Sequence, residues 1–270
     1  MSPTTAFDPR AYVPAPAELA GRVVAITGAS DGIGRAVAIA CAQHQAQVIL
    51  IGRNEKKLEE VHMTIAATSA PEATIAVLNL ETALARDYDA VADAIEERYG
   101  RLDGLLHNAA LLGTLTPIEH YDMATWCRVL HVNVTAAFAL TQVLLPALRK
   151  SADASVVFTA SSVGRHARAY WGAYAVSKFA LEGLSQVLGD ELEGTSHVRV
   201  NTLNPGRART AMRRSAYPAE DIETVPLPSS LTDPYIALLG PASHGVTGQA
   251  FDAQPLSRPG ADASSARSSS

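Results

Sequence analysis

The chain has 270 residues, of which 47% are apolar and 18% charged, a balance that predicts one globular domain with a sizeable core. Its 22 basic and 27 acidic residues give a net charge of −5, which argues against general binding of nucleic acid or anionic lipid. Cys41 and Cys127 form neither a CxxC pair nor a disulfide framework, and the eight histidines lack metal-ligand spacing. We therefore expect a cytoplasmic protein without a metal site.

The two ends of the chain differ in composition from its centre. Residues 1–20 are rich in proline and alanine and predict a loose arm, and residues 255–270 are rich in serine and predict a disordered tail. The first ten residues have no apolar segment of the signal-peptide type. We expect the domain at residues 21–254.

A glycine-rich turn follows the first predicted strand, residues 23–27, at once. The strand is a continuous apolar, largely β-branched run, which is typical of burial on both faces. The turn is Gly28-Ala29-Ser30-Asp31-Gly32-Ile33-Gly34, and a helix is expected at 35–44. Glycines allow close approach of the backbone, and the free N–H groups of a helix N-terminus attract an anion. The pattern predicts a phosphate cradle, and a turn that only packs helix on strand is the alternative.

An arginine follows the second predicted strand, residues 47–51. In dinucleotide-binding folds an acidic residue near this position binds the ribose 2′-hydroxyl, whereas an arginine accommodates a 2′-phosphate. Gly52 and Arg53 stand here, and no carboxylate occurs before Glu55. The sequence thus favours NADP(H) over NAD(H), with a solvated charge as the alternative for Arg53.

The rest of the chain continues to alternate strands with helices. Strands are predicted at 74–80, 102–107, 155–159, 198–203 and 249–251, and helices at 55–67, 83–99, 122–149 and around Tyr174. This order predicts an α/β fold, a single-domain Rossmann-type doubly wound parallel sheet of about seven strands with helices on both faces. Ligands of such sheets bind at the carboxyl ends of the strands.

One predicted helix has an uncharged segment, residues 129–148. It contains polar residues and Pro146, which a membrane-spanning helix tolerates badly. We expect a buried or interface helix here and no membrane span.

Tyr174 and Lys178 are four residues apart on a predicted helix and so share one face. A neighbouring ammonium favours the phenolate form of tyrosine, whose reference pKa is near ~10. The pair is suited to proton transfer, although a tyrosine and a lysine at this spacing also occur by chance.

With these segments assembled, residues 20–253 resemble the short-chain dehydrogenase/reductase family. Five motifs carry the resemblance in the family's order: Thr27-Gly28-x-x-x-Gly32-Ile33-Gly34, Asn108-Ala109-Ala110, Asn133, Ser161 and Tyr174-x-x-x-Lys178, with Pro205-Gly206 and Thr210 in support. Four shorter segments resemble the bacterial YciK-like branch of the family: Leu102-Asp103-Gly104, His107-Asn108, Trp171-Gly172-Ala173-Tyr174 and Phe251-Asp252-Ala253-Gln254-Pro255.

The resemblance implies hydride transfer between NADP(H) and a carbonyl or alcohol substrate. Tyr174 would be the acid or base, Lys178 would lower its pKa and bind the nicotinamide ribose, and Ser161 would polarise the substrate. Asn133 would hold a water that links Lys178 to solvent. The implied cofactor-binding residues are Gly28, Ser30, Asp31, Gly32, Ile33 and Gly34 in the turn, Arg53, Asn79, Leu80, Asn108, Ala109 and Ala110 towards the adenine, and Tyr174, Lys178, Pro205, Gly206 and Thr210 at the nicotinamide.

Three features depart from the family pattern. Ala110 replaces the usual glycine, which costs little if its φ is negative, and Asn79 replaces a usual aspartate. After Gly206 come four arginines, Arg207, Arg209, Arg213 and Arg214, which could favour an anionic substrate or form a solvated face. Arg165, His166 and Arg168 could rim the substrate pocket or form an exposed loop, and residues 211–239 are expected to cover it.

The leading hypothesis is an NADP(H)-dependent oxidoreductase acting on a carbonyl/alcohol pair. The alternative, suggested by Ala110 and by the less settled biochemical roles in the YciK-like branch, is a sensor or scaffold that binds NADP(H) with little catalysis. Family members commonly bury an apolar helix face in an oligomer, so a homodimer or homotetramer is expected. The substrate cannot be read from the sequence.

Overall fold

The structure, a computed structural model, describes residues 7–255, and the tail predicted from residue 255 lies, apart from that residue, outside this range. Strands and helices alternate as the sequence predicts. The strands are β1 Val23–Thr27, β2 Gln47–Gly52, β3 Thr74–Val77, β4 Gly104–His107, β5 Ala154–Thr159, β6 Val198–Asn204 and β7 Ala250–Asp252. The helices are α1 Gly32–Gln43, α2 Glu55–Ala66, α3 Ala85–Tyr99, α4 Met123–Leu130, α5 Ala136–Arg149, α6 Gly172–Leu192, α7 Ala211–Ala216 and α8 Asp233–Leu239.

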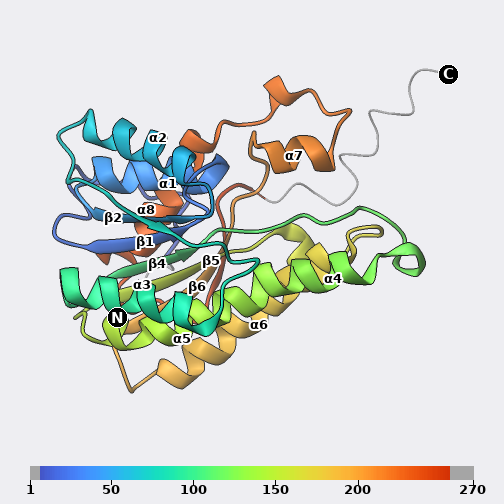
Figure 1. Cartoon of the computed structure of the whole chain (residues 1–270). Helices are drawn as coiled ribbons and strands as arrows, with labels where there is room; N and C mark the ends of the chain where they lie inside the picture. The colour runs from blue at the N-terminus through green and yellow to red at the C-terminus, as the bar shows by residue number, and fades with distance from the viewer. Residues whose placement is uncertain (1–6, 256–270) are drawn as a thin grey trace, which may run out of the picture.

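All seven strands pair in parallel, in the order β3-β2-β1-β4-β5-β6-β7. One apolar cluster joins α3, α5 and α6 to one face of the sheet, and a second joins α1, α2 and α8 to the other (Figure 1). Because β1, β4, β5 and β6 are covered on both faces, every residue in them is buried. The predicted doubly wound sheet is confirmed. It places all strand carboxyl ends at one edge.

The helix predicted at 122–149 is interrupted at its centre. A π-helical turn, His131–Thr135, separates α4 from α5, and the Ala136 N–H donates to the His131 carbonyl. Such turns are common at functional sites because they break the regular ladder of hydrogen bonds. By length and composition alone Met123–Arg149 could cross a membrane, and 44% of its most apolar window is buried in this fold. Leu140, Leu144 and Leu148 pack on the sheet, which fits the expected buried helix.

The end of the predicted N-terminal arm is attached to the domain. Leu19 is fully buried beside α8, and its N–H donates to the His44 carbonyl at 2.9 Å. Phe7 meets Phe251 of β7 edge to face, with ring centroids 5.7 Å apart. The expectation of a loose arm is therefore wrong for residues 7–20, because apolar side chains among the prolines anchor the segment. Residues 1–6 lie outside the described range.

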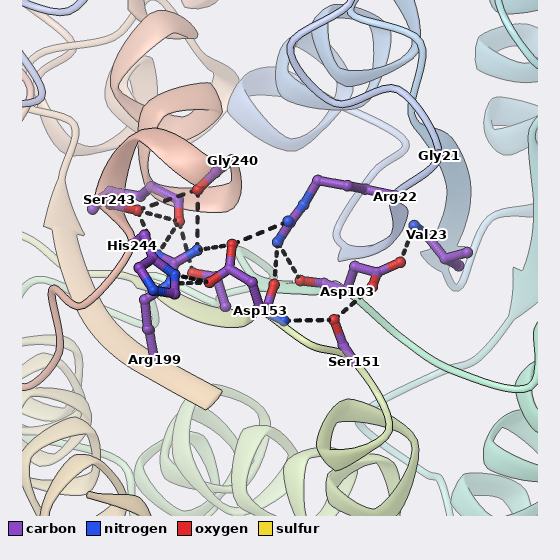
Figure 2. Close-up of polar contacts among 12 residues, drawn as sticks. Gly21, Arg22, Val23, Asp103, Ser151, Asp153, Arg199, Gly240, Ser243 and His244 are labelled. Carbon is purple, nitrogen blue, oxygen red and sulfur yellow. Dashed lines mark hydrogen bonds and ion pairs between the residues drawn. The ribbon is translucent and has the colours of Figure 1, made fainter. Parts of the chain in front are cut away.

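A polar network closes the amino edge of the sheet, opposite the strand carboxyl ends (Figure 2). Asp153 lies between two arginines, with Arg199 Nε donating at 2.8 Å and Arg22 Nη1 at 3.2 Å. Asp103 accepts hydrogen bonds from the Val23 N–H at 2.8 Å and the Ser151 hydroxyl at 2.6 Å. The network ties together the segments that lead into β1, β4, β5 and β6.

Candidate active site

One cavity of about 470 Å³ runs along the carboxyl edge of the sheet. Nearly every site residue predicted from the sequence lines it, and only Gly34 and Asn133 do not. The lining residues from that prediction are Gly28, Ser30, Asp31, Gly32, Ile33, Arg53, Asn79, Leu80, Asn108, Ala109, Ala110, Ser161, Tyr174, Lys178, Pro205, Gly206 and Thr210. Segments far apart in the sequence therefore meet in one site, as the parallel topology requires.

The glycine turn leaves no room for side chains at its critical positions. A Cβ on Gly28 would lie 2.9 Å from Ala109 Cα, and one on Gly34 would overlap the Gly28 carbonyl. Gly28 and Gly32 also have positive φ angles, +67° and +54°. The Asp31 carboxylate caps α1 by accepting from the Gly32 N–H at 2.7 Å. The turn thus brings bare backbone and a helix N-terminus against the cavity, which suits a pyrophosphate.

Thr27 fixes the loop that follows β4 against this turn. Its hydroxyl accepts from the N–H groups of Asn108 and Ala109, 3.0 and 3.1 Å away. Ala110 has a negative φ, since the non-glycine residues with positive φ in the described chain are Ala17, Gln45 and Tyr170. A Cβ at position 110 therefore causes no backbone strain.

Two cations stand at the rim of the cavity beyond β2. Arg53, with its side chain 58% exposed, pairs with Glu81 at 3.2 Å, and Lys57 pairs with Asp31 at 2.9 Å. All four side chains line the cavity. Lys57 was not predicted as a site residue. It lies in the first turn of α2, four residues after Arg53, and the direction of that helix places its side chain at the cavity.

Asn79 shapes the turn after β3, which ends at Val77 and is shorter than predicted. The Asn79 side-chain oxygen accepts from the Glu81 N–H at 3.1 Å. Glu81 then reaches both Arg53 and, at 2.8 Å, Arg128 of α4. Asn79, which stands where the family usually has aspartate, thus stabilises the turn that places the Glu81 carboxylate next to Arg53.

Tyr174 and Ser161 meet at the inner end of the cavity, next to Lys178. Burial raises the pKa of the Tyr174 phenol to about 12, against a smaller opposite effect of its hydrogen bond with Ser161. Lys178 Nζ donates to the Thr159 carbonyl at 2.7 Å and lies 5.6 Å from the centre of the Tyr174 ring. Burial also lowers the pKa of Lys178 to about 8. Burial is thus the largest effect on the Tyr174 pKa in this structure, and the lowering of that pKa by the neighbouring Lys178 ammonium stays a prediction.

Asn133 occupies the π turn and joins three segments behind the cavity. Its oxygen accepts from the Leu111 N–H at 2.7 Å, and its Nδ2 donates to the Leu111 carbonyl at 3.0 Å and the Ser177 hydroxyl at 2.9 Å. Ser177 in turn donates to the Tyr174 carbonyl at 2.7 Å. Both amide protons are thus used within the protein, so the side chain positions the Tyr174 helix, and the water that Asn133 is expected to hold stays a prediction.

Gln254 clamps the loop after β6. Its amide donates to the carbonyls of Pro205 and Arg207 at 2.8 and 2.7 Å. Gly206, with φ +73°, packs directly on this amide, since an added Cβ would lie 2.9 Å from Gln254 Cδ. Gln254 belongs to the segment Phe251-Asp252-Ala253-Gln254-Pro255, which resembles the YciK-like branch but predicts no role for this glutamine.

The outer end of the cavity is lined by apolar and aromatic side chains. From the predicted cover at 211–239 only α7 and Tyr217 take part, because α8 is buried against the sheet. Arg165 does not rim the pocket: it pairs with Glu182 at 2.8 Å and Asp252 at 3.0 Å. Arg168 is exposed and donates to the Tyr217 hydroxyl at 2.8 Å.

No group of three or more His, Cys, Asp or Glu side chains within residues 7–255 is arranged to hold a metal ion. The charged side chains that line the cavity are Asp31, Arg53, Lys57, Glu81, Lys178 and Arg213.

Comparison with known proteins agrees with this geometry. A family model described as short chain dehydrogenase matches residues 22–221. The Escherichia coli oxidoreductase YciK, itself uncharacterized, is 47% identical over 249 residues, which cover 92% of this chain and 98% of YciK.

Solved structures give the same result. A protein from Pseudomonas syringae assigned to the short-chain dehydrogenases has 51% identity and a TM-score of 0.89, covering 92% of this chain and 99% of its own. Another, from Escherichia coli CFT073 and complexed with NADPH, has 48% identity and a TM-score of 0.87, covering 89% of this chain and all of its own.

Proposed function

Since this chain belongs to the short-chain dehydrogenase/reductase family, in its YciK-like branch, we propose that it is an NADP(H)-dependent oxidoreductase acting on a carbonyl/alcohol pair. The observation that carries the proposal is the single cavity that runs from the glycine turn and Arg53 to Tyr174 and Ser161. The NADPH complex of the Escherichia coli CFT073 relative supports the choice of cofactor.

The residues of the cavity fit a dinucleotide with a 2′-phosphate. The turn from Gly28 to Gly34 offers the backbone N–H groups of a helix N-terminus to the pyrophosphate. Arg53 and Lys57 would bind the 2′-phosphate, because both are exposed cations on the same rim. Asn79 and Leu80 would lie along the adenine, and Pro205, Gly206 and Thr210 along the nicotinamide. When bound, the cofactor supplies or accepts the hydride.

Tyr174 holds the proton that a reduced carbonyl needs. Burial keeps its phenol protonated at neutral pH, so the proton is in place before the substrate arrives. Ser161, in hydrogen-bond contact with that phenol, polarises the carbonyl oxygen. Lys178, fixed by the Thr159 carbonyl, adds a nearby positive charge that stabilises the phenolate left after proton transfer.

A screen of NADPH oxidation over a panel of aldehydes and ketones tests the proposal against the sensor alternative. Turnover at least about tenfold above background is expected for one or more carbonyl compounds. Tight NADPH binding with no turnover across the panel would contradict it. Ala110, which suggested the alternative, adopts a negative φ without strain, so no observation now favours a sensor.

We also propose that the protein is a homodimer or homotetramer. Val176, Phe179 and Val187 form an exposed stripe on α6, where these residues are 44%, 43% and 57% exposed, and Phe138 of α5 is 48% exposed. Such a surface is typical of an interface between subunits. Light scattering should give a dimeric or larger mass that Val187→Asp reduces, and a monomer at micromolar concentration would contradict this.

A cytoplasmic location is proposed from the cysteines. Cys41 is buried, Cys127 is exposed, and both are free thiols. Cell fractionation should recover the protein with cytoplasmic markers, and recovery in the membrane fraction would contradict the assignment.

A further inference from the structure

The side chains that line the outer half of the cavity indicate what kind of substrate it can bind. Beyond Tyr174 its wall is formed by Leu112, Trp171, Met212 and Tyr217. The Trp171 ring lies 5.7 Å from that of Tyr174 and 5.8 Å from that of Tyr217, centroid to centroid. An aromatic wall therefore extends from the proton donor outward, at distances typical of ring–ring contact.

Arg213 is the one charged side chain in this half of the cavity among the described lining residues. Its Nε and Nη2 donate to the two carboxylate oxygens of Glu220, 2.7 and 2.6 Å away. Its guanidinium also stacks on the Tyr217 ring, 3.7 Å from the centroid. Only 17% of the Arg213 side chain and 18% of the Glu220 side chain are exposed, so the two opposite charges form a bidentate ion pair that is largely shielded from solvent.

The other arginines after Gly206 do not add charge to the cavity. Arg207, Arg209 and Arg214 are absent from its lining. Arg209 pairs with Glu223 at 2.8 Å, and Arg207 approaches Glu220 at 3.7 Å. Arg207 and Arg209 are thus engaged by carboxylates within the segment, and Arg214 is exposed outside the cavity.

We propose that the enzyme takes uncharged aromatic carbonyl compounds, whose ring packs on the Trp171–Tyr217 wall, and that Glu220 selects against anionic ones by neutralising Arg213. The inference rests on the proposed oxidoreductase function. An anionic substrate that displaced Glu220 from Arg213 would only exchange one carboxylate for another. It would also lose its own hydration and meet the repulsion of the displaced Glu220.

Matched probes test the selection by charge. In the activity arm, kcat/KM for NADPH-dependent reduction is measured with 4-methylbenzaldehyde and 4-formylbenzoate. In the binding arm, calorimetry on the enzyme–NADPH complex uses 4-methylbenzyl alcohol and 4-(hydroxymethyl)benzoate, which NADPH does not reduce. We expect the neutral member of each pair to be preferred by at least about tenfold.

Two charge variants make the test specific. Glu220→Gln removes the negative charge that pairs with Arg213 and should lower the preference for the neutral probe at least about tenfold. Glu223→Gln removes the negative charge that pairs with Arg209, which does not line the cavity, and should leave the preference unchanged. Tyr217→Leu should lower kcat/KM for 4-methylbenzaldehyde by about threefold to tenfold, while Tyr217→Phe should retain it.

The two arms separate the inference from the function on which it rests. Preference for the anionic probes, weak binding of both alcohols, or equal responses of the Glu220 and Glu223 variants would overturn the inference. Selective binding of the neutral alcohol without any turnover would support the inference and contradict the oxidoreductase function.

Discussion

Lys178 donates a hydrogen bond from its ammonium group to the backbone carbonyl of Thr159, 2.7 Å away. Thr159 ends β5, two residues before Ser161, so this bond joins the strand that carries Ser161 to the helix that carries Tyr174. Burial lowers the pKa of Lys178 to about 8, while the nearby Glu182 carboxylate has the opposite effect. The lysine is therefore positioned by the protein itself, and its charge persists at neutral pH.

The first prediction concerns pH. Because burial raises the pKa of Tyr174 to about 12, its phenol is protonated throughout the neutral range. Carbonyl reduction should thus be independent of pH between about 6 and 7.5, whereas alcohol oxidation, which needs the phenolate, should rise roughly tenfold per pH unit. Steady-state profiles in both directions check this. A plateau for oxidation below pH 7 would show that the phenol ionises far more easily than its burial indicates.

Arg53 should discriminate between the two nicotinamide cofactors. Loss of a charge-assisted hydrogen bond costs about 1.5–3 kcal/mol, so Arg53→Ala should raise the Kd for NADPH by about tenfold or more. The Kd for NADH should change less than about twofold. Lys57→Ala should have an effect of the same sign, since Lys57 stands on the same rim. Equal losses for NADPH and NADH in the Arg53 variant would argue against a 2′-phosphate site there.

Gln254 should act through the loop that it clamps. Gln254→Ala removes two hydrogen bonds to the Pro205 and Arg207 carbonyls, and we expect kcat/KM for a verified substrate to fall by about tenfold. Gln249→Ala, at an exposed position next to β7, serves as control. Comparable loss of activity in both variants would mean that general destabilisation, and not loop position, is responsible.

Asp153 should stabilise the fold above acid pH. Burial raises the pKa of this carboxyl, but the hydrogen bond from Arg199 and the charges of Arg199 and Arg22 outweigh burial, and the net pKa lies below its ordinary value. Its stabilisation is thus present above the unfolded pKa of about 3.9 and is lost as the pH falls below it. Asp153→Asn should cost about 3 kcal/mol at pH 7, and this cost should shrink as the pH falls from about 3.9 through the folded pKa of Asp153.

Denaturant unfolding of the wild type, Asp153→Asn and the exposed control Asp93→Asn measures this difference. The control should change the free energy of unfolding by less than about 0.5 kcal/mol. A cost for Asp153→Asn that did not shrink on acidification would assign the effect to packing.

Local patterns predicted the sheet well. The buried run at residues 23–27 became β1 without change, and the alternation of strands and helices gave the parallel order. The family resemblance supplied most of the site residues, and the parallel sheet explains why Gly28, Ser161 and Pro205 meet at one edge. Leu19 was missed, since a single apolar residue among prolines has no periodicity to reveal its burial.

Contacts between distant segments could not be predicted from the sequence. No residue pattern in the sequence distinguishes the π turn at Asn133 from the helices on either side. The pairing of Arg213 with Glu220 depends on how the chain folds back after α7. Likewise, the raised pKa of Tyr174 reflects burial by the whole fold, which the i, i+4 spacing to Lys178 does not reveal. Residues in recognisable motifs were therefore predictable, and hydrogen bonds and ion pairs between distant segments were not.

The central claim is that Tyr174 donates the proton in carbonyl reduction. Tyr174→Phe keeps the ring and removes only the hydroxyl, so NADPH affinity should change less than about threefold. With a verified carbonyl substrate, kcat should fall by about 10²–10⁴-fold. Turnover of that substrate by Tyr174→Phe at the parent rate would contradict the claim.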